Sequence, residues 1–106
     1  MAKFVVYIIT VDANGNATVT PDAPALKVGD QVSFISNDPT TVIRYRDTSP
    51  FAEAEVGPQK ELPVGKGQGP YKCVTEGKHH FDCGFMNNNK FQLWGVTKGA
   101  DTPVGH

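Results

Sequence analysis

Side chains that bind soft metal ions gather in one stretch near the end of the chain. Four of them are His79, His80, Cys83 and Met86, and Cys73 precedes this group. Thiolate and thioether sulfur suit Cu(I), and imidazole suits several transition metals including copper. The stretch therefore predicts either a metal site or part of a buried core, and the elements that carry these residues decide between the two.

The alternation of side chains along a strand limits which of these groups could share an ion. Successive residues of a strand point to opposite faces, so His79 shares a face with Cys83 while His80 points away. The set His79, Cys83 and Met86 is the arrangement that could bind copper or transfer electrons. In the other interpretation the two histidines have no role as ligands, one lying on the surface and one near a turn.

The two cysteines allow a further outcome. If residues 71–76 and 79–84 form a hairpin that turns through residues 77–79, Cys73 lies directly opposite Cys83, close enough to form a disulfide. A two-residue turn would instead place Cys73 opposite His80. A disulfide worth roughly 2–3 kcal/mol and a pair of reduced core thiols both stay open, and the disulfide would remove the thiolate that copper needs.

The elements that position these residues are expected to be strands. The chain has 11 Gly and 8 Pro, and no stretch free of turn residues keeps a helical period, which is typical of an all-β sandwich. Strands are expected at residues 3–11, 17–20, 25–28, 31–36, 41–46, 60–64, 71–76, 79–84 and 90–97. Residues 1–97 are predicted to form one domain, residues 47–69 to be mostly irregular, and residues 98–106 to be a loose tail.

Composition argues against several classes of function. The formal net charge is −1, which gives no reason to expect a nucleic-acid partner, and no apolar run has the length of a membrane span. Arg44, Arg46 and Lys3 could form a small basic stripe on a sheet face. No nucleophile is accompanied by a base and an oxyanion site, so the chain is not predicted to be an enzyme.

Several segments, taken in order, resemble the cupredoxins. They are residues 26–34, which run strand, Gly-Asp, strand; the pair Asn37 and Asp38; residues 49–51; and residues 77–83, which end at Cys83. The similarity extends from about residue 25 to residue 94. It implies an antiparallel Greek-key sandwich of about eight strands.

The resemblance also implies where copper would be bound. A type 1 centre needs two imidazoles, one thiolate and a weak axial thioether. Thr41 stands where the family has its first histidine, and no histidine lies between Cys83 and His106. Only Cys83 and Met86 keep ligand chemistry at family-like positions, so we expect a domain without a complete copper site and without a cofactor.

A structural or binding module is therefore the leading expectation, with an unknown protein or small ligand as its partner. Residues 47–69 and the loop at 84–89 are the expected contact surfaces, because loops on a rigid sandwich usually carry recognition. The sequence predicts neither the oligomeric state nor the compartment. An extracytoplasmic location, periplasmic or secreted, would follow if a signal peptide had been removed and the disulfide formed.

Overall fold

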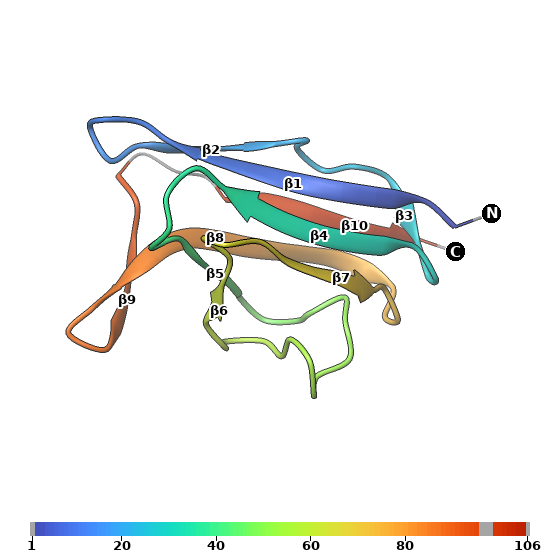
Figure 1. Ribbon diagram of the computed structural model, residues 1–106. Helices are drawn as coiled ribbons and strands as arrows, with labels where there is room; N and C mark the ends of the chain where they lie inside the picture. Colours follow the sequence, from blue (N-terminus) through green and yellow to red (C-terminus); the bar gives the residue numbers. More distant parts are fainter. Residues whose placement is uncertain (1, 96–98, 106) are drawn as a thin grey trace.

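The computed structural model describes residues 2–95 and 99–105, and over these residues it contains ten strands and no helix. The strands form two sheets that face each other across a shared core (Figure 1). The predicted all-β, sandwich-like class is confirmed. Nine strand ranges were predicted, and the tenth strand is formed by Ala100–Gly105, where a loose tail was expected.

The first sheet has the order β2-β1-β4-β7. Its strands are β1 (Phe4–Val11), β2 (Ala17–Thr20), β4 (Gln31–Ser36) and β7 (Gln68–Lys72). In β1 the residues Tyr7, Ile9 and Val11 are buried and those between them are exposed, as expected for a strand with one face on a core. β1 and β4 run parallel, with Tyr7 opposite Phe34.

The second sheet has the order β3-β10-β8-β5-β6, and β9 also pairs with β8. Its strands are β3 (Leu26–Lys27), β5 (Val42–Tyr45), β6 (Leu62–Pro63), β8 (Gly77–Asn87), β9 (Lys90–Leu93) and β10 (Ala100–Gly105). The long β8 lies at the centre, between β10 on one side and β5 on the other.

β9 and β10 both pair with β8. β9 pairs with the end of β8 and β10 pairs with its beginning, both antiparallel. After β9 the Gly95 amide donates to the Gly15 carbonyl at 2.8 Å, which ties this part of the chain to the β1–β2 turn.

The prediction that all strands pair antiparallel is wrong in two places. β1 pairs with β4 in parallel, and β3 pairs with β10 in parallel, so both sheets are mixed. The chain between β1 and β4 contributes β3 to the opposite sheet before it returns. Strand direction depends on such crossovers, which residue alternation does not encode.

The prediction of a loose C-terminal tail is also wrong over residues 99–105. Ala100, Thr102 and Val104 are buried, and β10 lies between β3 and β8 inside the second sheet. The alternation of Ala, Thr and Val was hidden by Pro103 and by the short length of the segment. Residues 96–98 and 106 lie outside the described residues, so the predicted end of the strand at 90–97 and the ends of the predicted tail lie there too.

The predicted hairpin between residues 71–76 and 79–84 does not form. β7 pairs with β4 in the first sheet, whereas β8 belongs to the second sheet and places Cys83 opposite Ile43. The chain crosses from one sheet to the other before Gly77, whose φ is +132°. Two apolar strands around a glycine turn have the same local pattern whether they pair or cross between sheets, so the sequence did not separate the two.

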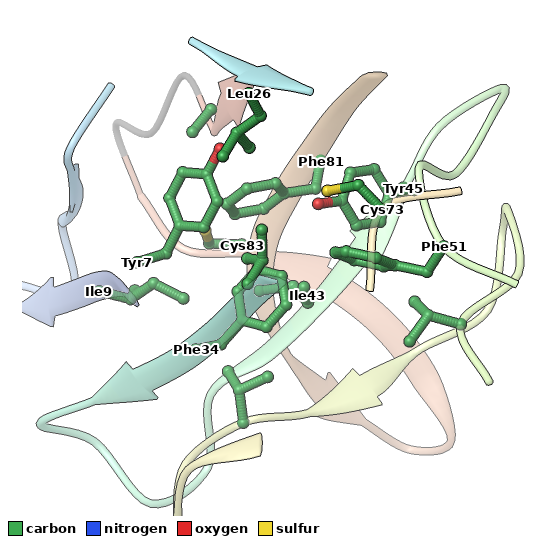
Figure 2. Packing of buried hydrophobic residues seen from close by; sticks show 14 of the residues in the cluster. Tyr7, Ile9, Leu26, Phe34, Ile43, Tyr45, Phe51, Cys73, Phe81 and Cys83 are labelled. Carbon is green, nitrogen blue, oxygen red and sulfur yellow. The ribbon is translucent and has the colours of Figure 1, made fainter. Parts of the chain in front are cut away.

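Aromatic rings fill the space between the sheets (Figure 2). Phe81 of β8 contacts Tyr7 and Phe34 of the first sheet and Tyr45 of its own, with ring centroids 5.1–5.6 Å apart. The Thr102 hydroxyl lies 3.0 Å from the Tyr7 hydroxyl and 2.8 Å from the Tyr45 hydroxyl. Three polar atoms thus satisfy one another inside the core, which removes the cost of burying them alone.

Candidate functional site

The positions that the family resemblance assigns to copper are occupied by residues with other roles. Thr41 is 1 % exposed, and its hydroxyl is bonded to the Ser36 hydroxyl at 2.8 Å. Cys83 is fully buried and faces the core, whereas Met86 is 42 % exposed and lies opposite Phe91 on the outer side of the sheet. The two sulfur side chains therefore point to opposite faces of β8.

His79 is a buried structural histidine with both ring nitrogens occupied. Its Nε2 donates to the Thr75 carbonyl at 3.0 Å, because a carbonyl oxygen only accepts. Its Nδ1 then accepts from the Thr48 hydroxyl at 2.7 Å. A metal would have to break one of these bonds to reach the imidazole, and His79 sits beneath the surface near the β7–β8 turn.

The alternative ligand set His79, Cys83 and Met86 is not brought together. Strands rise about 3.3 Å per residue, so His79 and Cys83 lie about 13 Å apart along β8, with the buried Phe81 side chain between them. Ligand atoms must lie within about 2.0–2.3 Å of a bound ion. Among the described residues no three His, Cys, Asp or Glu side chains are grouped in a way that could hold a metal.

Both cysteines carry free thiols in the core. Cys73 follows β7, where its amide donates to the Asp30 carbonyl at 2.8 Å, and Cys83 lies within β8 of the other sheet. Burial raises the pKa of Cys73 to about 11 and that of Cys83 to about 12. At neutral pH both sulfurs are protonated, so neither is poised as a nucleophile or metal ligand.

A row of charged residues crosses the outer face of the second sheet. Arg46 Nε and Nη2 donate to the two carboxylate oxygens of Asp82 at 2.9 and 2.8 Å. His80 Nδ1 donates to Asp101 at 2.7 Å, and Lys78 lies 3.6 Å from the same carboxylate. The hydrogen bond from His80 is the main reason that the pKa of Asp101 is lowered. These charges neutralise each other, and the row ties β5, β8 and β10 together.

Next to this row lies a surface that we call the outer patch, made of Arg44, Met86, Phe91 and Leu93. The Arg44 guanidinium carbon lies 4.5 Å from the centre of the Phe91 ring. Met86 and Leu93 are 42 % and 50 % exposed, and Phe91 is half-buried. Large apolar side chains and a cation thus share one accessible face of β5, β8 and β9.

Val42 underlies this patch. It pairs with Gly84 in the same register that places Arg44 opposite Asp82, so its side chain is on the outer face. It is nevertheless 4 % exposed, although it lies outside the main core cluster. Gly84 has no side chain with which to cover its neighbours. The outer patch therefore has a buried apolar residue beneath it and is more than a set of isolated surface residues.

The segment from residue 47 to residue 69 is mainly irregular, as predicted, but much of it is anchored. Phe51, Val56 and Val64 are buried in the main core, and Phe51 contacts Phe34 and Tyr45 edge-on. The side chain of Gln59 donates to the Arg46 carbonyl. None of its large apolar side chains is exposed, so this segment offers less free apolar surface than the outer patch.

Sequence reasoning identified part of the outer patch and missed the rest. It placed Arg44 and Arg46 on one outward face, and this is confirmed, but Lys3 lies next to the first sheet, just before β1. It treated Met86 only as a ligand and did not single out Phe91 or Leu93. The alternation of Lys90, Phe91, Gln92 and Leu93 was a detectable signal, but apolar residues at every second position normally indicate a buried face.

The comparisons with known proteins do not identify the chain. No family model, no curated protein and no solved structure matches it. Among the described residues no helix is long and apolar enough to cross a membrane.

Proposed function

We propose that this chain is a cupredoxin-like Greek-key domain without a type 1 copper site, and that it acts as a binding module for another protein. The outer patch is its contact surface. The proposal combines the family resemblance over residues 25–94 with the placement of side chains on β8 and β9.

The first support is where the side chains that could bind copper lie in the structure. His79 has both nitrogens in hydrogen bonds, Cys83 is a buried thiol, and Met86 points to the other face. A trigonal site of two nitrogens and one sulfur needs all its donors at one point. The residues present do not fit such a site, and the same positions serve packing instead.

The observation that carries the binding role is the outer patch. Met86, Phe91 and Leu93 present apolar surface beside a cation. The β8–β9 turn that carries them lies at the end of the molecule away from both termini (Figure 1). Clustered exposed apolar side chains on a small domain mark interaction sites more often than isolated ones do.

The copper-free part of the proposal is tested by titration with Cu(I) and Cu(II). We expect no intense thiolate-to-copper absorption band and no stoichiometric copper in protein purified without chelator. One equivalent of tightly bound copper that is lost in Cys83→Ala would instead support the ligand set of His79, Cys83 and Met86.

The binding role is tested by selecting peptides from a random twelve-residue library displayed on phage. We expect the selected peptides to bind the native protein and to lose binding in Leu93→Glu. The matched control is Ile8→Glu, because Ile8 is 44 % exposed on the outer face of the first sheet. The assignment of the contact surface would be contradicted if peptide binding were lost equally in both variants, or if it were lost in neither.

A further inference from the structure

We propose that the partner segment of the outer patch is an acidic one, in which a carboxylate binds Arg44 while neighbouring apolar side chains pack on Met86, Phe91 and Leu93. This inference rests on the proposed binding function and names the chemical class of the partner. It is carried by the difference between two arginines on one strand.

Arg44 and Arg46 stand on the same face of β5 but have opposite environments. Arg46 binds both carboxylate oxygens of Asp82. The Arg44 side chain has neither a hydrogen bond nor an ion pair within the part of the chain that the structure describes, and its Nε is buried without an acceptor. The carboxylate opposite Arg44 in the ladder is Asp82, which Arg46 already occupies.

The position of Arg44 over Phe91 prepares it for an anion. The ring contact holds the guanidinium plane near the surface without using any of its hydrogen-bond donors. The two Nη groups of Arg44 are not among the buried polar atoms, and a carboxylate can accept from both of them in a bidentate geometry. A partner that brings a carboxylate would satisfy donors that this chain leaves unmatched.

The surroundings of Arg44 favour a peptide over a small anion. Met86 and Leu93 expose apolar surface on the same face, and Val42 lies buried beneath it. A small inorganic anion would contact the guanidinium and leave this surface in water. A protein segment that alternates Asp or Glu with Leu, Ile or Phe satisfies the cation and covers the apolar groups at once.

The experiment uses the same phage library and the full chain. We expect the peptides that depend on Leu93 to be enriched in Asp and Glu next to large apolar residues. For the strongest synthetic peptide, changing its carboxylates to amides should weaken binding at least about tenfold, because hydrogen bonds to charged groups are lost. Binding should weaken in Arg44→Lys and more in Arg44→Gln, and should fall with added salt.

Comparing the carboxylate and amide peptides on two variants separates an effect on binding from an effect on folding. In Arg44→Gln the carboxylate and amide peptides should bind equally, whereas in Ile8→Glu their tenfold difference should persist. If Leu93-dependent peptides lack acidic residues, or if Arg44→Gln retains the difference, the acidic partner is refuted while the binding surface stands. If no selected peptide depends on Leu93, both the partner class and the proposed function are refuted.

Discussion

At the level of single residues, burial determines the chemistry of the sulfur atoms. Cys73 and Cys83 contact no solvent, and their thiol pKa values are raised to about 11 and about 12. At pH 8 a thiol with a pKa near 11 is ionised in about one molecule in a thousand. The thiolate is the reactive form, so these cysteines behave as small apolar core residues.

This predicts a simple pattern of labelling. In native protein at pH 8, neither cysteine should react with Ellman's reagent within minutes, and both should react at once in strong denaturant. Mass spectrometry of unreduced, denatured protein after alkylation should show two labels per chain. A native protein that reacts promptly, or a denatured one without free thiols, would contradict the buried thiol pair.

A second residue-level prediction concerns acid. The pKa of Asp101 is lowered, chiefly by the hydrogen bond from His80. Its carboxylate therefore stabilises the fold above the ordinary carboxyl pKa, and this contribution is lost as pH falls below about 4 toward the folded-state pKa. Between pH 7 and pH 3 the native protein should lose more unfolding free energy in urea than Asp101→Asn does.

The control for that measurement is Asp22→Asn, because the Asp22 side chain is exposed in a loop. It should show the same acid sensitivity as the native protein. A parallel decline of all three proteins would mean that the pair of His80 and Asp101 contributes nothing to the pH dependence.

At the level of elements, the β8–β9 turn depends on two asparagines with left-handed backbone. The φ angles of Asn88 and Asn89 are +52° and +64°. This conformation at both central residues suits a two-residue hairpin turn, and asparagine tolerates it well. The sequence predicted a loop at residues 84–89, but β8 continues to Asn87 and only Asn88 and Asn89 form the turn.

Substitution at this turn gives a directional test. Asn89→Val should lower the unfolding free energy by about 1–2 kcal/mol, because a β-branched side chain is strained at positive φ. Asn89→Gly should be neutral or slightly stabilising. Urea midpoints for the three proteins would show this order, and a stable Asn89→Val would refute the turn geometry.

Local pattern predicted the existence of strands better than their partners. Residues 17–20 and 31–36 were predicted with the observed bounds, because alternation and flanking turn residues are local signals. The pairing of β7 with β4 was missed, because it depends on a crossing between the sheets. The candidate site was only partly visible because Arg44 and Phe91 meet across β8, and no local spacing reveals a contact between strands that are not neighbours.

At the level of the whole molecule, β10 completes the second sheet. Thr102 joins the hydroxyls of Tyr7 and Tyr45, and Ala100 and Val104 are buried on either side of it. A chain that ends at residue 99 would leave β3 and half of β8 without partners. We expect it to lack a cooperative thermal transition.

Adding a synthetic peptide of residues 100–106 to the truncated chain should restore the transition. The control peptide carries Val104→Asp, which places a charge at a buried position, and it should fail. Circular dichroism during heating would measure both. A cooperative transition in the truncated chain by itself would mean that β10 is dispensable.

The order of strands along the chain also has a consequence for synthesis on the ribosome. Every strand of the first sheet lies before residue 73. In the second sheet β3 cannot pair until β10 has been made, because Leu26 pairs with Val104. A nascent chain can thus assemble β2, β1, β4 and β7 while the inner aromatic side chains of that sheet still lack their cover. The growing polypeptide is most exposed to aggregation, and most in need of a chaperone, before β8 emerges and places Phe81 against Tyr7 and Phe34.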